Sequence, residues 1–217
     1  AAAINAMLPS DARQTAARVT IGTMGASFLI SVIAFFKVAG GGRVYHNFDW
    51  FSFGNGQLQL GWLLDPLSAA MLMMVTFVGL CIFVYSVAYM AHDARQKQFF
   101  TFLSLFAAAM LGLIISNSLL LLFMCWEVVG LASYLLIGFW FEKPSAAAAC
   151  KKAFITTRIG DIGFLLGIAW LAKENGSLLF YDDGRGFLEQ GALEHLNGLM
   201  VGGMTAATAI GLLLFCG

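Results

Sequence analysis

An apolar run from residue 116 to residue 141 most constrains what this chain can fold into, because it contains a single charged side chain, Glu127. A helix needs about 20 apolar residues to cross roughly 30 Å of hydrocarbon, so this run is long enough to span a bilayer. Glu127 lies near its middle, where a charged side chain costs at least about 2.5 kcal/mol. Such residues in spans pair with other groups or mark proton pathways. Glu127 is therefore a candidate proton carrier, with helix-to-helix hydrogen bonding as the alternative.

The composition of the whole chain is that of a membrane protein. It is 60% hydrophobic and 11% charged, with a mean hydropathy of +0.83, whereas soluble domains carry about 25% charged residues. We therefore predict an all-α, polytopic bundle of transmembrane helices in a lipid bilayer. Twelve basic residues balance twelve acidic ones, so no basic excess indicates nucleic acid. The four cysteines form no CxxC pair and the histidines lie outside the apolar runs, so we expect no metal site, iron–sulfur cluster or haem from this chain alone.

The pattern predicts one transmembrane region of five full spans and one partial or terminal span, at 19–38, 63–90, 99–115, 119–140, 152–172 and 198–216. First spans and extramembrane loops occupy 1–62, a charged-helix core occupies 63–172, and a polar loop with a further span occupies 173–217. Because apolar runs lie at both ends, we expect a piece of a longer polypeptide.

Local signals refine this outline. Alternating polarity over 44–62 around Gly54-Asn55-Gly56 predicts a β-hairpin, with an irregular loop as the alternative. Asp65 and Pro66 are typical of a helix N-cap and first turn. The polar segment 173–197 has room for a short surface helix.

Basic residues predict the orientation, because cytoplasmic loops carry an excess of Lys and Arg. Under the predicted spans, seven fall on one side and four on the other, and Arg158 is embedded. The loops 91–98 and 142–152 should therefore face the cytoplasm and the hairpin should lie outside. The larger group comprises Arg13, Arg18, Arg95, Lys97, Lys143, Lys151 and Lys152, and the smaller group Lys37, Arg43, Lys173 and Arg185.

A second group of ionisable residues lies in the span that follows Glu127. Arg158 and Asp161 are three residues apart, so they can pair on one helical face, and Lys151 lies seven residues earlier on nearly the same face. The alternative is a self-neutralising pair that only eases insertion. Tyr134 lies seven residues after Glu127 and could offer a hydroxyl. Glycines at 160, 163 and 167 indicate close helix packing.

Several motifs resemble the antiporter-like membrane subunits of respiratory complex I, in the family of NADH-quinone oxidoreductase subunit L. They are WEVVGL at 126–131 and SYLLIGFW at 133–140, with LDPLS at 64–68, KAF at 152–154 and TRIGD at 157–161. The similarity is clear over 63–172 and corresponds to the N-terminal third of that subunit. It implies that Glu127 forms a proton channel with a lysine on a later helix, one that would begin near Gly217. Arg158 and Asp161 match the charged helix beside that glutamate, with Lys151 and Tyr134 as further candidates.

The resemblance also implies a setting. The chain would be a non-redox subunit of the NADH:quinone oxidoreductase translocase, and NAD, FMN, iron–sulfur clusters and quinone would be bound by partner subunits. The other membrane-arm subunits would be its partners, in a bacterial cytoplasmic membrane rather than the mitochondrial inner membrane. Alternatives are a subunit of a multisubunit sodium/proton antiporter or of an inorganic-carbon uptake complex. A membrane-arm scaffold without transport is an alternative of another class.

Overall fold

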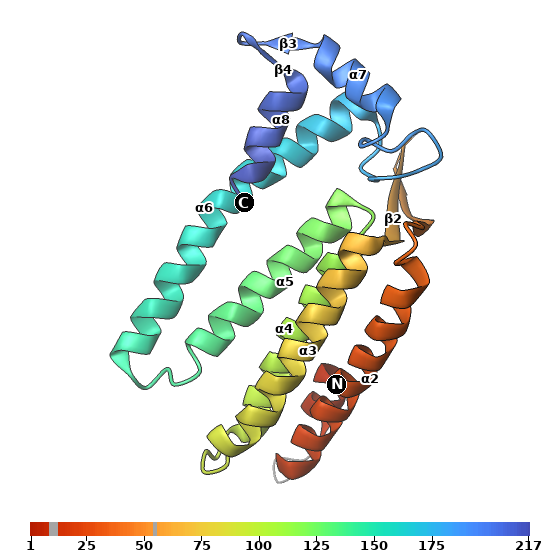
Figure 1. Cartoon of the computed structure of the whole chain (residues 1–217). Helices are drawn as coiled ribbons and strands as arrows, with labels where there is room; N and C mark the ends of the chain where they lie inside the picture. Colours follow the sequence, from red (N-terminus) through yellow and green to blue (C-terminus); the bar gives the residue numbers. More distant parts are fainter. Residues whose placement is uncertain (9–12, 54–55) are drawn as a thin grey trace. The chain divides into compact units, whose positions relative to one another are not determined.

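The structure, a computed structural model, describes residues 1–8, 13–53 and 56–217 (Figure 1). Helices dominate it, as the apolar runs predict, because a helix satisfies its backbone hydrogen bonds internally. The elements are α1 (Ala2–Met7), α2 (Arg13–Val38), β1 (Val44–Phe53), β2 (Gly56–Leu64), α3 (Pro66–Tyr89), α4 (Gln96–Ile114), α5 (Leu119–Ile137), α6 (Pro144–Asn175), α7 (Gln190–Gly198), β3 (Met200–Val201), β4 (Met204–Thr205) and α8 (Ala206–Phe215).

Five of these helices are long and apolar enough to cross a membrane: α2, α3, α4, α5 and α6. This confirms the five predicted full spans, and the sixth run is the shorter apolar helix α8. The chain is therefore an integral membrane protein with a polytopic helical fold. The main difference is that α6 begins at Pro144 rather than near residue 152. Proline suits the first helical turn and the alanines at 146–149 are strong helix formers, so they extend the helix beyond its apolar part.

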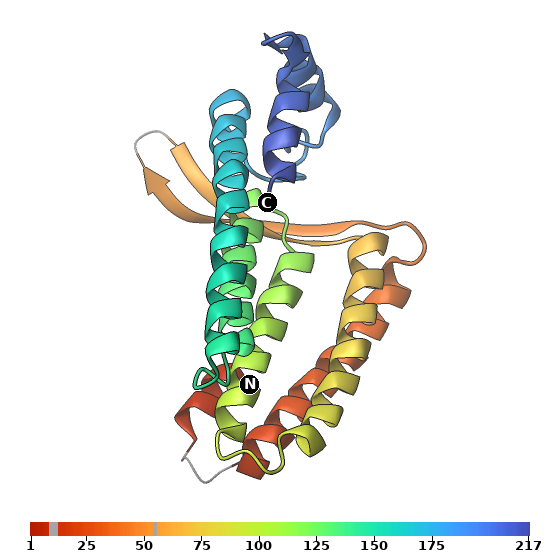
Figure 2. The same cartoon turned by 90° about the vertical axis from the view of Figure 1, so that its left-hand side faces the viewer.

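The chain divides into two compact units, and the first comprises residues 1–44, 64–115 and 125–150. Within it, α2 packs along α3, and the two lie side by side in both views (Figure 1 and Figure 2). Buried Met24, Phe83 and Phe100 belong to its core. A methyl group at Gly79 would lie 2.2 Å from Met24 Cε, so the end of the Met24 side chain occupies the space that the glycine leaves open. Hydroxyl pairs also join the helices, such as Ser31 Oγ and Thr76 Oγ1 at 2.9 Å.

Helix α3 begins with the predicted cap. The Asp65 carboxylate accepts a hydrogen bond from Ser68 N at 2.7 Å, and Ser68 Oγ accepts one from Asp65 N at 2.8 Å. Pro66 occupies the first helical position. These reciprocal bonds satisfy backbone donors that the helix itself leaves unpaired, so the structure confirms capping for Asp65.

The second unit comprises residues 45–63, 116–124 and 151–217. Strands β1 and β2 pair in a two-stranded sheet, which confirms the predicted hairpin strands, while the predicted turn residues Gly54 and Asn55 lie outside the described residues. Fully buried Asn117 joins this sheet to the segment after α6. Its Nδ2 donates to Asn47 Oδ1 at 2.6 Å and to Tyr181 O at 2.9 Å.

The segment between α6 and α7 has a defined structure of its own. Tyr45 donates a hydrogen bond to the Asp183 carboxylate, and this bond raises the pKa of the Tyr45 hydroxyl. The Glu189 carboxylate accepts a backbone hydrogen bond from Gly184 N at 2.9 Å. The predicted short surface helix is present as α7, at the end of this segment.

The glycine series in α6 packs against α8, as its spacing predicts. A Cβ atom would lie 2.5 Å from Cys216 O if built at Gly160, and 2.7 Å from Cys216 Cβ if built at Gly163. At Gly167 it would lie 2.9 Å from Leu214 Cδ2. Any larger residue at these positions would therefore force the two helices apart.

The orientation in the membrane is tested by cysteine labelling. The native cysteines are first replaced by serine. We then expect His92→Cys to react with a membrane-impermeant maleimide only from the cytoplasmic side, and Asp49→Cys only from the opposite side. The reason is the seven-to-four bias of basic residues. Labelling of both positions from the same side would refute this topology.

Candidate functional site

Glu127 is the only charged residue of α5 and the ninth of its nineteen residues. It therefore lies about 12 Å from the start of the helix at 1.5 Å per residue, well within the apolar span. Its side chain is partly buried, and so is that of Tyr134 two turns later. Seven residues bring the helix back to nearly the same face, so Tyr134 lies on the face that carries Glu127.

Helix α5 approaches α4 closely just before Glu127. A Cβ atom on Gly112 of α4 would lie 2.9 Å from Cys125 Sγ. Cys125 is two residues from Glu127, so the glutamate lies within one helical turn of this close approach to α4. The glutamate and this contact both belong to the first unit.

The predicted Arg158–Asp161 ion pair is present in α6, in the second unit. Arg158 Nη1 lies 3.6 Å from Asp161 Oδ2, and the side chains are 32% and 9% exposed respectively. The Arg158 guanidinium also lies over the ring of Phe154, at 4.5 Å from its centroid. A carboxylate this buried is costly unless paired, and the arginine contributes to making its burial tolerable.

Lys151 lies seven residues before Arg158 in the same helix and is exposed. The threonines between them bond to the backbone, as Thr156 Oγ1 donates to Lys152 O at 2.8 Å and Thr157 Oγ1 to Phe154 O at 2.9 Å. In the described ranges, no three histidine, cysteine or acidic side chains are grouped so as to hold a metal ion.

These groups allow acid–base chemistry inside a membrane. A carboxyl group surrounded by hydrocarbon retains its proton until a cation or water approaches, and then releases it. Glu127 is a carboxyl group within an apolar span, in α5. Arg158 and Asp161 supply a charge pair in α6 that can exchange partners when a proton arrives.

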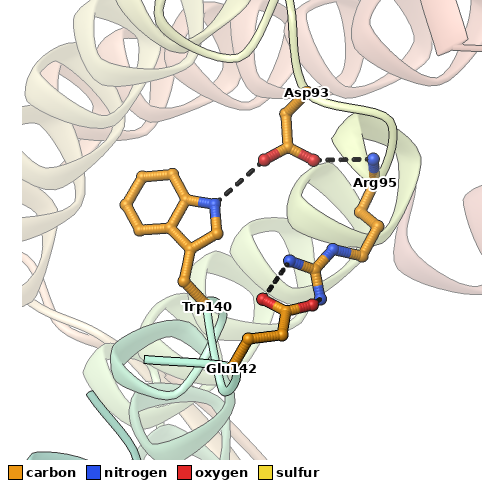
Figure 3. Close-up of polar contacts among 4 residues, drawn as sticks. All are labelled: Asp93, Arg95, Trp140 and Glu142. Atoms are coloured by element: carbon orange, nitrogen blue, oxygen red, sulfur yellow. Dashed lines mark hydrogen bonds and ion pairs between the residues drawn. The ribbon is translucent and has the colours of Figure 1, made fainter. Parts of the chain in front are cut away.

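A further cluster joins two loops of the first unit (Figure 3). Trp140 Nε1 donates to Asp93 Oδ2 at 2.9 Å, and Arg95 N donates to Asp93 Oδ1 at 2.7 Å. The Arg95 guanidinium binds both carboxylate oxygens of Glu142 at 3.0 Å. We call Asp93, Arg95, Trp140 and Glu142 the loop latch.

Aromatic rings enclose the loop latch. The guanidinium carbon of Arg95 lies 5.3 Å from the Phe139 ring centroid and 5.1 Å from that of Phe141. An exposed ion pair alone contributes at most about 1 kcal/mol, but bidentate geometry and cation–π contacts strengthen it. The latch connects loop 91–95 to loop 138–143, so the two loops lie on the same side of the membrane. The predicted topology requires this.

Sequence profiles place these features in a known group. Residues 50–100 match the profile described as "NADH-Ubiquinone oxidoreductase (complex I), chain 5 N-terminus". Residues 116–215, which contain Glu127 and the Arg158–Asp161 pair, match the one described as "NADH:quinone oxidoreductase/Mrp antiporter, TM". The chain belongs to this family of antiporter-like membrane subunits. The resemblance inferred from its motifs is therefore confirmed.

Individual family members agree over most of the chain. NAD(P)H-quinone oxidoreductase chain 5 of Synechocystis is 40% identical over 209 residues, covering 94% of this chain and 29% of the relative. F(420)H(2) dehydrogenase subunit L of Methanosarcina mazei is 53% identical over 131 residues, covering 60% of this chain and 19% of the relative. The chain thus spans less than a third of the length of these relatives.

The fold is also shared with a solved membrane complex. The Mrp complex of Dietzia superposes with a TM-score of 0.74 at 21% identity, over 99% of this chain and 22% of that one. At this identity the likeness concerns the fold alone.

Proposed function

We propose that this chain forms part of a proton-translocating membrane-arm subunit of a complex I-type quinone oxidoreductase. The observation that carries the proposal is Glu127, a partly buried carboxyl near the middle of a membrane span of this family. A carboxylate at this depth is too costly for a purely structural element unless it is paired or used. A scaffold would also have no need of the buried Asp161 beside Arg158.

Each candidate residue has a distinct role in this proposal. Glu127 alternates between protonated and ionised forms as water and a cation approach and withdraw. Arg158 and Asp161 close on each other in one state and release in another, which changes the field at the proton pathway. Exposed Lys151, in the first third of the same helix, releases a proton or takes one up again, and Tyr134 offers a hydroxyl on the face of Glu127.

The redox chemistry is assigned to other subunits. Oxidation of a nucleotide donor, electron transfer through flavin and iron–sulfur clusters, and quinone reduction belong to partners in the same complex. A relative named as an F(420)H(2) dehydrogenase subunit indicates that members of the family serve different electron donors. We place the complex in a bacterial cytoplasmic membrane.

A sodium/proton antiporter subunit is the second candidate. It is favoured by the profile matched by 116–215, whose description names both the quinone oxidoreductase and the Mrp antiporter. In that case ion exchange would not depend on electron transfer.

Ion dependence separates these two functions. In inverted membrane vesicles that contain the assembled complex, we expect quinone reduction to acidify the lumen in sodium-free buffer, because the carrier is a carboxyl that binds protons. A protonophore should abolish the signal. Proton movement that requires sodium, and that proceeds without an electron donor, would instead establish the antiporter.

A further inference from the structure

We propose that the loop latch is a positioning device for the proton pathway: it fixes the orientation of the helix that carries Glu127. This inference rests on the proposed function. Its members lie in the loops after α3 and after α5, and none is placed in the pathway itself (Figure 3).

The first step is that the latch is rigidly joined to α5. After the helix ends at Ile137, Gly138 N still donates to Tyr134 O at 3.0 Å, and Phe139 N donates to Leu136 O at 3.3 Å. Phe139 also packs edge-on against Phe99 of α4, with ring centroids 5.5 Å apart. The turn therefore moves with the last turn of α5, and whatever holds the turn also holds the helix.

The second step is that the latch holds α5 at the end opposite its contacts nearer the start. Leu119 N, at the first residue of α5, donates a hydrogen bond to Leu178 O at 2.9 Å. Further along, Cys125 lies close to Gly112 of α4. Trp140 is fifteen residues after Cys125, about 22 Å away if the rise of 1.5 Å per residue is extended that far. Attachment at this distance restricts the tilt and the rotation of the helix more than the earlier contacts alone.

The third step is that the latch has the directional contacts for this task. The Trp140 indole donates to Asp93 at 2.9 Å, and the ring lies against Tyr89 at the end of α3, with centroids 6.2 Å apart. Arg95, immediately before α4, is held by Glu142 and by the two phenylalanine rings. Planar, bidentate contacts fix rotation as well as distance. The end of α5 is thus oriented against both α3 and α4.

Rotation of α5 would turn the Glu127 carboxyl away from its proton donors and acceptors. Proton transfer requires heavy atoms within about 3 Å, directly or through one water, so small misplacements have large effects on rate. A positioning residue should therefore change how fast protons pass and the pH at which Glu127 titrates, without being on the route.

The test compares assembled complexes that differ in the latch. We expect Arg95→Ala to lower the rate of proton translocation roughly two- to tenfold and to shift its pH profile, because the carboxyl moves to different surroundings. The exchange Arg95→Glu with Glu142→Arg should recover most of the rate, since it rebuilds the pair. Lys97→Ala is the matched control: it removes a basic residue beside the same loop, one that contacts the carbonyl groups of Ala6 and Leu8 instead.

The inference is overturned if assembled Arg95→Ala has the rate and pH profile of Lys97→Ala. If Arg95→Ala prevents assembly, Trp140→Phe replaces it in the same comparison, because it keeps a smaller aromatic ring and removes the donor to Asp93. Glu127→Gln, measured in parallel, separates the two proposals. If Glu127→Gln loses pumping while the latch variants behave like the wild type, the positioning role of the latch is refuted and the proposed function stands. If Glu127→Gln pumps like the wild type, the proposed function is refuted.

Discussion

Glu127→Gln is expected to abolish or sharply reduce proton translocation through this subunit while the complex still assembles. Glutamine keeps the size of the side chain and can hydrogen-bond across helices, but it cannot take up and release a proton. A loss of at least about tenfold corresponds to 1.4 kcal/mol or more in the barrier. The measurement is the number of protons moved per electron transferred in reconstituted vesicles, after the yield of intact complex has been compared with wild type.

Glu127→Asp is the matched control for this result. It keeps the titrating group but shortens its reach, so we expect partial pumping. If Glu127 only bonds a neighbouring helix, glutamine should behave nearly like the wild type, because an amide forms such bonds as well. Wild-type stoichiometry in the glutamine variant would therefore support helix bonding over proton transfer.

Asp161→Asn is expected to have the second largest effect, because it leaves Arg158 without its carboxylate partner in a poorly hydrated span. Removing one member of a buried ion pair costs about 3–5 kcal/mol. Since the Arg158 side chain is 32% exposed, we expect the lower end of that range. The loss should appear as lower assembly or slower pumping.

A double-mutant cycle measures this pairing. Asp161→Ala and Arg158→Ala should each be harmful, while the variant with both changes should be milder than either one, because no uncompensated charge remains. Strictly additive effects of the two single changes would show that the 3.6 Å contact does not couple the residues.

Features that depend on local sequence were predictable. The spans follow from continuous apolarity, and the capping box follows from an aspartate and a proline immediately before an apolar run. The Arg158–Asp161 pair follows from helical spacing alone, because residues three apart share a face. Family motifs indicated Glu127 as a candidate site residue, and its role stays a prediction because it depends on partner groups that local sequence does not specify.

The loop latch could not be predicted in this way. Asp93 and Trp140 are 47 residues apart, and their bond depends on how the ends of α3 and α5 and the start of α4 lie relative to one another. The sequence did offer a signal in three aromatic residues followed by two charged residues over 139–143, although the same pattern is typical of side chains at a membrane interface. The role of Asn117 was missed for a similar reason, since its bonds join segments 64 and 70 residues away.

The central claim is that the carboxyl of Glu127 changes protonation during turnover, and infrared difference spectroscopy of the assembled complex tests it most directly. Spectra recorded with and without electron donor should show a carboxylic acid C=O band in the wild type and in Glu142→Gln, and the band should be missing in Glu127→Gln. A band of equal size in the wild type and in Glu127→Gln would contradict the account.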